Sequence, residues 1–390
     1  MGIDSKPEPI NKKKVLHIVS ALNRGGAETL LMNIYRKIDR EQLQFDFVSH
    51  RNEKNDYEDE IMALGGRIYK VPSLGQIGPF AYVKELVKIM SDNQYEVVHA
   101  HTDYQGGFVA VAAKIAGIKK RICHSHSNNW PQDSGIKARV ILKVLQSIIK
   151  YAGTNYCACS VEAARFLFGE RMLQSQRIEL IKNGIDINQF TDIDAGSSVS
   201  VRGELNIPNT AKLIGHIGSF SESKNHVFIL KVLKQILKRD SNFVAILVGD
   251  GPLRISIELK AKQLGIFENI RFLGVRKDIP RLMKSFDVFI FPSLFEGFGI
   301  VTLEAQSAGV PCVVADTLPN NTDMGLGIMS FVDLDEEIEI WCKEIYKALL
   351  KERPDREFII NNISKLGFDI NDNIYEWLSL YGIVCKEEVG

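Results

Sequence analysis

The 390-residue chain contains only six cysteines, and no two of them form a CxxC pair. Such sparse usage argues against a disulfide-stapled secreted domain and favours reduced thiols in a cytosolic protein. Excess charge of either sign is also absent, because 48 Lys and Arg residues balance 48 Asp and Glu residues. A dedicated nucleic-acid-binding protein usually carries a basic excess, so we expect no nucleic-acid partner.

Long apolar segments are missing as well. No run of eighteen apolar residues occurs, and residues 1–14 contain no apolar core. The sequence therefore predicts neither a membrane span nor a signal peptide, and we expect a cytoplasmic protein. Hydrophobic residues make up 45% and charged residues 25% of the chain. These figures indicate an ordinary globular protein whose core is large enough to need no disulfide or structural metal.

Short β-branched runs alternate with amphipathic stretches along most of the chain. This alternation predicts right-handed βαβ units and parallel sheets, which is an α/β fold. In the first half we expect strands at 14–20, 45–49, 67–71, 97–101, 121–125, 156–160 and 178–181. In the second half we expect strands at 213–217, 243–248, 270–273, 288–291 and 311–315.

A polar segment interrupts the alternation. Residues 189–210 contain Gly196, Ser197, Ser198 and Pro208 and show little apolar periodicity, so we expect an interdomain linker there. The predicted domains are residues 1–188 and 211–372, and a C-terminal helix within 373–390 is expected to pack back on the first domain. Because ligands of open parallel sheets bind beyond the carboxyl ends of the strands, we expect two Rossmann-like domains facing a cleft that holds the site.

The most informative segment is residues 291–316, FPSLFEGFGIVTLEAQSAGVPCVVAD. A buried strand is followed by a glycine-containing loop with Glu296, a helix that carries Glu304, and a second buried strand. Glycines at a helix start let backbone N–H groups approach an anion, and the helix dipole favours negative charge there. Glu296 suits a ligand's hydroxyls or developing positive charge, and Glu304 suits a ribose diol. A capped helix with solvated acids explains the same pattern equally well.

The Glu-x7-Glu spacing of Glu296 and Glu304, within PSLFEGFG…EAQSAGVPCVV, resembles the signature of family-four retaining glycosyltransferases of the two-Rossmann, or GT-B, type. Other stretches resemble the family in the same order: GGAE (25–28), VHAH (98–101), HSHSN (124–128), CSVEAARFLFG (159–169), IKNGID (181–186), SKNH (223–226), VGDGPL (248–253) and FLG…DIP (272–280). The likeness covers roughly residues 14–385 and is greatest to the branch that builds capsular polysaccharides and exopolysaccharides.

The resemblance implies transfer of a hexose from a nucleotide diphosphate sugar, most simply a UDP-sugar, to a glycan or lipid-linked glycan acceptor. It implies retention of the anomeric configuration and no metal or other cofactor. Glu304 would hold the ribose, Glu296 would contact the donor sugar, and His126 would be the active-site histidine beside that sugar. The other implied donor-binding residues are Lys224, the backbone N–H groups of Phe298, Gly299 and Ile300, and Gly26 at the first helix of the N-terminal domain.

Ser219 departs from the family pattern, which usually has an arginine in a Gly-Arg pair shortly before the lysine. In IGSFSESK the serine keeps a hydrogen bond but lacks the formal charge and the bidentate fork of an arginine. Either Lys224 or Arg276 compensates, or donor affinity and activity are reduced. Ser219 therefore leaves open a non-catalytic nucleotide-sugar-binding subunit, and a phosphorylase-type enzyme on the same fold is a second alternative.

Four histidines alternate along two expected strands, so that each pair shares one face: His99 with His101, and His124 with His126. The next strand carries Cys157 and Cys159, which makes a zinc site conceivable. However, HxH with CxC is not a standard zinc spacing, and strand-end histidines lining a polar cleft are favoured over a metal. Cys159 and Cys312 lie in apolar strands and are expected to be buried, inert thiols.

Residues 136–151, IKARVILKVLQSIIKY, combine a wide apolar face with Lys137, Arg139, Lys143 and Lys150. A basic amphipathic helix of this kind can lie on an anionic membrane. An ordinary packed helix with solvated lysines explains the pattern equally well. The sequence thus leaves open a peripheral position at the inner face of the cell membrane.

Overall fold

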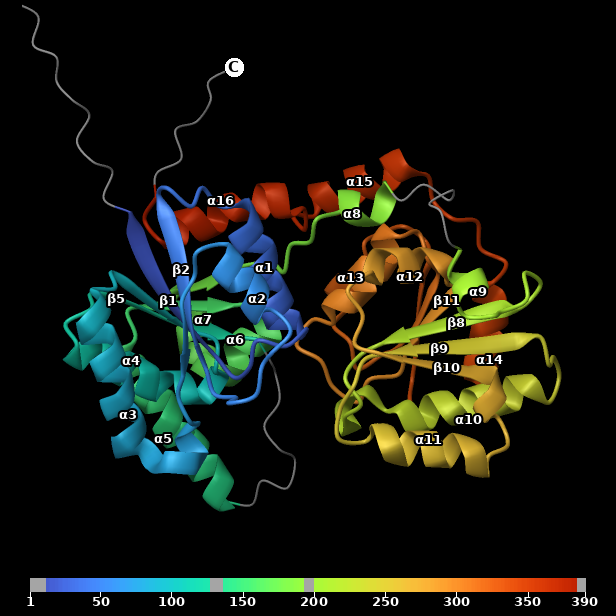
Figure 1. The fold of residues 1–390 in the computed structure, drawn as a ribbon, viewed down its shortest axis with the longest axis horizontal. Helices are drawn as coiled ribbons and strands as arrows, with labels where there is room; N and C mark the ends of the chain where they lie inside the picture. The colour runs from blue at the N-terminus through green and yellow to red at the C-terminus, as the bar shows by residue number, and fades with distance from the viewer. Residues whose placement is uncertain (1–11, 127–135, 193–199, 384–390) are drawn as a thin grey trace, which may run out of the picture. The chain divides into compact units, whose positions relative to one another are not determined.

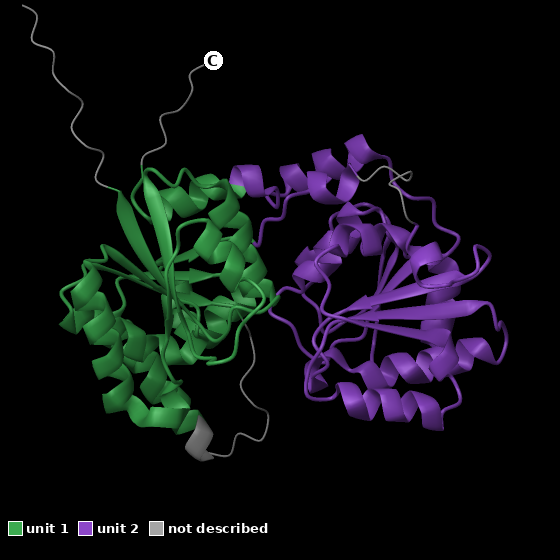
Figure 2. Cartoon of the chain, in the orientation of Figure 1, with its two compact units in different colours: residues 1–182, 373–390 green, residues 183–372 purple. Residues whose placement is uncertain are grey.

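The computed structural model describes residues 12–126, 136–192 and 200–383, with side chains from Arg139 onward in the second range. The chain forms two compact units, residues 1–182 with 373–390 and residues 183–372 (Figure 2). We call them unit 1 and unit 2. Each unit is a parallel sheet covered by helices (Figure 1). No helix in the described ranges is both long enough and apolar enough to cross a membrane.

Unit 1 contains a seven-stranded sheet in the order β3-β2-β1-β4-β5-β6-β7. Its strands are β1 (Lys13–Val19), β2 (Leu43–Ser49), β3 (Ile68–Lys70), β4 (Val97–Ala100), β5 (Lys120–Ser125), β6 (Asn155–Ala158) and β7 (Ile178–Leu180). Its helices are α1 (Gly26–Lys37), α2 (Glu58–Ala63), α3 (Leu74–Asn93), α4 (Gly106–Ile115), α5 (Ile136–Ala152), α6 (Val161–Phe168) and α7 (Glu170–Gln174), with a 3-10 turn at Asp103–Gln105. The last helix, α16 (Ile370–Leu380), contributes its residues from Asn373 onward to this unit.

Unit 2 contains a six-stranded sheet in the order β10-β9-β8-β11-β12-β13. Its strands are β8 (Lys212–Ile217), β9 (Phe243–Val248), β10 (Ile270–Gly274), β11 (Val288–Phe291), β12 (Cys312–Ala315) and β13 (Met329–Val332). Its helices are α8 (Asn188–Thr191), α9 (Val201–Glu204), α10 (His226–Leu237), α11 (Arg254–Gln263), α12 (Ile279–Ser285), α13 (Ile300–Ser307), α14 (Ile338–Ala348) and α15 (Arg356–Lys365). Short 3-10 turns lie at Glu222–Lys224, Phe267–Asn269 and Asn320–Thr322.

Both sheets have the all-parallel pairing that the alternating pattern predicts, and every expected strand is present within a few residues of its expected bounds. The central strands are buried along their whole length, as in Phe243–Val248 and Val288–Phe291, because helices cover both faces of such a sheet. β13 was not expected. It has only four residues, it lies at the sheet edge, and three of its side chains are half-buried, so it lacks the apolar run that marks the other strands.

The described part of the expected linker, residues 189–192 and 200–210, packs within unit 2. Phe190, Val201 and Ile207 are buried in the core of that unit. Arg202 donates to the Ala211 carbonyl at 2.7 Å and forms an ion pair with Asp287 at 3.0 Å. Residues 193–199 of that linker, and residues 384–390 of the expected C-terminal segment, lie outside the described residues.

Strand order reverses between β1 and β4 in unit 1 and between β8 and β11 in unit 2. In open parallel sheets, ligands bind in the crevice outside the carboxyl ends of the strands at this reversal. The loops that follow β1 and β4 in unit 1 and β8 and β11 in unit 2 are therefore the first places to look for functional side chains.

Candidate functional site

The loop after β11 ends at the start of α13 with a glycine in a conformation that L-residues rarely adopt. Gly299 has a φ of 75° and precedes Ile300, the first residue of the helix. The first backbone N–H groups of a helix lack intrahelical acceptors, so this turn presents donors to an anion. Phe298 is buried and stacks on Phe368 at 5.1 Å between ring centroids, which holds the turn in place. Phe298, Gly299 and Ile300 thus lie in one turn at the carboxyl end of β11.

Glu296 forms an ion pair with Lys224 in this ligand-free structure. The Ser293 hydroxyl also donates to the Glu296 carboxylate at 2.8 Å. The two charged side chains are largely shielded from solvent, with 19% of Lys224 and 13% of Glu296 exposed. The Lys224 ammonium also lies 5.0 Å from the centre of the Phe291 ring. Two residues that the resemblance assigns to different parts of the donor therefore neutralise each other before a ligand binds.

Serine hydroxyls line the loop after β8. The Ser219 and Ser221 hydroxyl oxygens are 3.0 Å apart, and those of Ser221 and Ser223 are 3.1 Å apart. The Leu294 N–H donates to the Ser223 carbonyl at 2.8 Å, which ties this loop to the loop after β11. Ser219 itself is exposed. Its hydroxyl can donate to an anion, but it brings no charge.

The turn after β9 supports the loop after β8. Gly249 and Gly251 both have positive φ values, 129° and 158°. A Cβ at Gly249 would overlap the Gly218 carbonyl, and a Cβ at Gly251 would lie 2.7 Å from the Phe220 carbonyl oxygen. This turn therefore does more than reverse the chain. Its two glycines allow the backbone of the loop after β8 to pack directly against the backbone of the turn.

Glu304 lies one turn along α13 and is half-buried. Burial raises the pKa of its carboxyl group from 4.5 to about 7. Its carboxylate has no hydrogen-bond partner within the described residues, unlike Glu296. A shielded carboxylate without donors is a suitable acceptor for a pair of ligand hydroxyls, because such hydroxyls would supply the hydrogen bonds that burial has removed.

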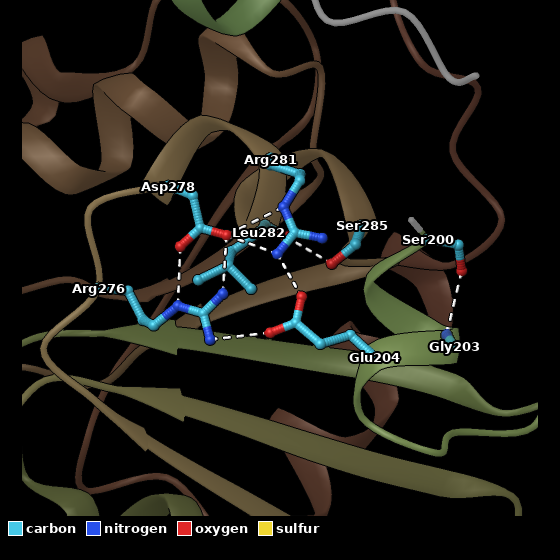
Figure 3. A network of polar contacts seen from close by, with 8 residues as sticks. All are labelled: Ser200, Gly203, Glu204, Arg276, Asp278, Arg281, Leu282 and Ser285. Carbon is cyan, nitrogen blue, oxygen red and sulfur yellow. Dashed lines mark hydrogen bonds and ion pairs between the residues drawn. The ribbon is translucent and has the colours of Figure 1, made fainter. Parts of the chain in front are cut away.

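Arg276, one of the two residues expected to compensate for Ser219, is engaged elsewhere (Figure 3). Its guanidinium binds the Asp278 carboxylate through two hydrogen bonds of 2.8 Å and contacts Glu204 at 2.9 Å. Arg281 bridges the same two carboxylates. These partners raise the pKa of Arg276, and they hold the pKa of Asp278 well below its usual value. Arg276 is therefore held by two carboxylates, whereas Lys224 has one carboxylate partner and packs beside Gly218, the neighbour of Ser219. Lys224 is the better candidate to compensate.

His126 directly follows β5 in unit 1, and its backbone is held from two sides. Its N–H donates to the Asp103 carboxylate at 2.9 Å, and the Cys159 thiol contacts its carbonyl oxygen at 3.7 Å. Asp103 has a φ of 44°, an uncommon conformation for a residue other than glycine. The two residues that follow in the HSHSN stretch, Ser127 and Asn128, lie outside the described residues.

The imidazole rings of unit 1 form two hydrogen-bonded chains. In the first chain His17 Nδ1 lies 3.0 Å from His101 Nε2, and His101 Nδ1 lies 2.8 Å from His126 Nε2. In the second chain the Tyr381 hydroxyl lies 2.9 Å from His99 Nδ1, and His99 Nε2 lies 3.1 Å from His124 Nδ1. Burial lowers the pKa of His17 to about 3 and that of His126 to about 4. It holds the pKa values of His99, His101 and His124 well below 6.5.

Two sets of three histidines bring ring nitrogens within 4.8 Å of one another: His17, His99 and His101, and His101, His124 and His126. The rings of His124 and His126 are stacked, with centroids 4.1 Å apart and planes within 22°. Lone pairs lie in the ring planes, so stacked rings do not direct them at a common point. The arrangement favours hydrogen-bonded chains over a shared zinc ion, and Cys157 and Cys159 take part in neither set.

Sequence reasoning missed His17 and Tyr381. His17 lies on β1 directly opposite His99 on β4, and Tyr381 directly follows α16. A signal for His17 was present, because β1 and β4 are neighbours whenever strand order reverses at the first strand of a doubly wound sheet. Tyr381 gave no comparable signal. Cys159 and Cys312 are buried as expected, and burial raises the pKa of Cys159 to about 12.

Gly26, predicted to face a phosphate, is exposed at the N-terminus of α1. Glu28 lies in the same first turn, and its side chain folds back over Gly25 so closely that a Cβ there would overlap it. Burial raises the pKa of Glu28 to about 7. A carboxylate at a helix N-terminus interacts favourably with the helix dipole, so a phosphate that approached Gly26 would meet Glu28 at the same helix end.

Comparisons with known proteins point to one family. The model described as "Glycosyltransferase Family 4" matches residues 24–189, and the model described as "Glycosyl transferases group 1" matches residues 200–324. EpsF of Bacillus subtilis (strain 168), named as a glycosyltransferase, is 40% identical over 381 residues, which are 97% of this chain and 98% of that protein. The capsular polysaccharide biosynthesis glycosyltransferase CapH of Staphylococcus aureus is 26% identical over 94% of this chain and 98% of its own. The crystal structure of Anabaena Alr3699/HepE in complex with UDP and glucose matches with a TM-score of 0.77 and 20% identity, covering 95% of this chain and all of that chain.

Proposed function

The chain belongs to glycosyltransferase family 4, a family of retaining hexosyltransferases, and from that premise we propose that it transfers a hexose from a UDP-sugar to a hydroxyl of a growing cell-surface glycan. Its similarity to a capsular polysaccharide biosynthesis glycosyltransferase supports a role in polysaccharide biosynthesis. The observation that carries the proposal is the set of residues at the carboxyl ends of β8 and β11. There Glu296, Lys224 and the start of α13 lie together, and Glu304 follows one turn later.

The proposed donor is a UDP-sugar because Anabaena Alr3699/HepE, which has the same fold, is described with UDP and glucose. In this proposal Glu304 accepts hydrogen bonds from the ribose diol, and the backbone N–H groups of Phe298, Gly299 and Ile300 bind the distal phosphate. Lys224 neutralises diphosphate charge, and the Ser219 hydroxyl adds a hydrogen bond. Glu296 and His126 are proposed to contact the donor sugar, and Gly26 is proposed to face the phosphates.

The proposed chemistry breaks the bond between the anomeric carbon and the diphosphate oxygen and forms a bond from the acceptor oxygen to the same face of that carbon. The acceptor's proton passes to the departing phosphate oxygen. Charge builds up on the diphosphate in the transition state, so preorganised donors at Lys224 and the start of α13 are expected to supply most of the rate enhancement. Because these groups provide the positive field, we expect turnover without an added divalent cation.

A panel of nucleotide sugars tests the donor assignment. Purified protein is incubated with each sugar in the presence of EDTA, and binding and slow hydrolysis of the donor are measured. UDP-hexoses should bind and release UDP, while GDP- and ADP-hexoses should not. Donor binding without hydrolysis or transfer would contradict a transferase, and phosphate-dependent release of hexose 1-phosphate would indicate a phosphorylase.

We also propose that unit 1 reaches a lipid-linked acceptor by resting on an anionic membrane through α5. Four apolar side chains of this helix are exposed: Val140 (55%), Ile141 (52%), Val144 (53%) and Tyr151 (72%). Arg139, Lys143 and Lys150 are exposed on the same helix, and the Lys114 ammonium lies 3.8 Å from the centre of the Tyr151 ring. Exposed apolar residues flanked by basic ones are the pattern of helices that lie in a membrane interface. The side chain of Lys137 lies outside the described residues.

Vesicle co-sedimentation tests this contact. The wild-type protein should pellet with vesicles of phosphatidylglycerol and phosphatidylcholine, less so at high salt, because each surface lysine adds about 1 kcal/mol of screened attraction. Lys143→Glu with Lys150→Glu should abolish pelleting and leave hydrolysis of the donor unchanged. The matched control, Lys260→Glu with Lys262→Glu on α11 of unit 2, should pellet normally. A wild-type protein that stays in the supernatant at low salt would contradict the contact.

A further inference from the structure

The chain of His17, His101 and His126 has a direction, which follows from the chemistry of neutral imidazole. Burial keeps all three rings neutral at pH 7. A neutral imidazole carries one N–H donor and one lone pair, so each ring in a chain must donate on one side and accept on the other. The proton at one end of the chain therefore determines which nitrogen is protonated at the other end.

The inner end of the chain is His17 Nε2. This atom is buried and has no hydrogen-bond partner among the described residues. The ring centroids of Phe45 and Phe47 lie 4.3 Å and 5.4 Å from that of His17, so the surroundings are largely aromatic carbon. Buried N–H groups without an acceptor are rare in proteins. His17 Nε2 is therefore assigned the lone pair, and the His17 proton resides on Nδ1.

The remaining protons follow from this assignment. His17 Nδ1–H donates to His101 Nε2 at 3.0 Å, and His101 Nδ1–H donates to His126 Nε2 at 2.8 Å. His126 then accepts at Nε2 and carries its own proton on Nδ1. His126 is half-buried, whereas His17 and His101 are buried, so Nδ1–H of His126 is the group that the chain leaves for a ligand.

We propose that His17 and His101 are positioning residues that hold His126 as its Nδ1–H tautomer, so that His126 donates a hydrogen bond to an oxygen atom of the bound ligand. The second half of this statement rests on the proposed function, in which that oxygen belongs to the donor sugar. A histidine in this tautomer has its lone pair occupied by His101 and cannot remove a proton from the acceptor. The direction is opposite to that of a histidine held by a carboxylate, whose free nitrogen carries the lone pair.

The first experiment reads the tautomer directly in the ligand-free, full-length protein. The eight histidines are labelled with ¹⁵N, and two-bond ¹⁵N–¹H correlation spectra distinguish protonated from unprotonated ring nitrogens. The His126→Gln variant identifies the His126 signals by their disappearance. At pH 7 the Nδ1 of His126 should be protonated and the Nε2 should not. A protonated Nε2, in the other tautomer or in an imidazolium, would overturn the proposal.

The second experiment reverses the hydrogen bond with an isosteric pair. His101→Asn keeps an N–H donor near the position of His101 Nδ1, whereas His101→Asp offers only acceptors there at neutral pH. The spectrum of the Asn variant should retain the Nδ1–H signature of His126, and that of the Asp variant should show a protonated Nε2. An Nε2 that stays unprotonated in a folded Asp variant would contradict the proposal. If the Asp variant does not fold, the wild-type spectrum still decides the tautomer.

A matched control is His99→Asn, which interrupts the second chain, between Tyr381 and His124, and leaves the contact of His101 with His126 in place. It should leave the His126 signature unchanged. With a UDP-sugar as donor, turnover should fall about 10-fold or more in His101→Asp and about threefold or less in His101→Asn, because only in the former does the ligand oxygen face a lone pair in place of the N–H donor. Spectra that behave as predicted with turnover unaffected would refute the role at the sugar and leave the tautomer assignment intact.

Discussion

The Glu304→Gln substitution tests recognition of the nucleotide alone, because its effect can be measured on the binding of UDP without a sugar or an acceptor. The substitution keeps the size of the side chain and removes the charge that the ribose diol is proposed to meet. A hydrogen bond to a charged group contributes about 1.5–3 kcal/mol, which corresponds to roughly 10- to 150-fold in affinity. Isothermal titration calorimetry with UDP alone at pH 8 should therefore show a loss of that size.

The pH dependence of UDP affinity gives a second and more specific test of the role of Glu304. The Glu304 carboxyl has a pKa of about 7 in the ligand-free protein, and only its ionised form is expected to accept both ribose hydroxyls. Affinity should be full above pH 7 and should fall as the pH falls through 7, by about 10-fold between pH 8 and pH 6. The phosphates of UDP also titrate in this range. The ratio of wild-type to Glu304→Gln affinity cancels that contribution and should shrink toward one at low pH.

Folding stability provides the control. The pKa of Glu304 is raised on folding, from 4.5 to about 7, so the folded state disfavours the ionised carboxyl. Stability is therefore lost as the pH rises between these values, and removing the charge should restore it. Glu304→Gln should unfold at the same temperature as the wild type at pH 8, or at a higher one. Glu336→Gln, at an exposed site of unit 2, should change neither property. Unchanged UDP affinity in Glu304→Gln would refute the ribose role.

Three further substitutions address the rest of the site. Glu296→Gln should lower turnover strongly while UDP binds at least as tightly as before, because Lys224 is freed from its ion pair; calorimetry showing weaker UDP binding would contradict this. His126→Ala should lower turnover by about 10-fold or more with UDP affinity within twofold, and parallel losses of both would place His126 at the nucleotide instead. Ser219→Arg should tighten UDP binding by about 10-fold if a charged fork fits at this position, whereas a folded variant that binds UDP more weakly would show that the loop has adapted to serine.

The fold was largely predictable because the strands of a parallel sheet form continuous apolar runs in the sequence. β9 (Phe243–Val248) and β11 (Val288–Phe291) are apolar at every position since helices cover both faces, and such runs stand out between amphipathic stretches. β13 is the strand that this pattern did not predict. At the sheet edge, with half-buried residues, Met329–Val332 is specified by pairing with β12 more than by its own composition.

For the candidate site, the sequence predicted which motif residues to consider but not the contacts that they make in the ligand-free protein. Glu296, Lys224 and Glu304 were identified by their positions in motifs, and the structure indeed brings Glu296 and Lys224 together. No motif shows that they pair with each other, because a motif reflects the ligand-bound roles of its residues. The engagement of Arg276 by Asp278 and Glu204 was hidden for a related reason. Glu204 is 72 residues away in the sequence and belongs to a segment that composition alone marks as a linker.

The pair of Lys224 and Glu296 has a consequence for how a donor is recognised. When a diphosphate draws Lys224 away, the shielded Glu296 carboxylate keeps only the Ser293 hydroxyl as a partner. A buried carboxylate that loses its countercharge is costly, and UDP alone offers it nothing in return. A UDP-sugar brings hydroxyls that can donate to Glu296 as Lys224 turns to the phosphates. If the proposed donor contacts form, the ion pair couples the two halves of the donor. We therefore expect the protein to bind a UDP-sugar more tightly than UDP, and we expect re-formation of the pair to favour release of UDP after transfer.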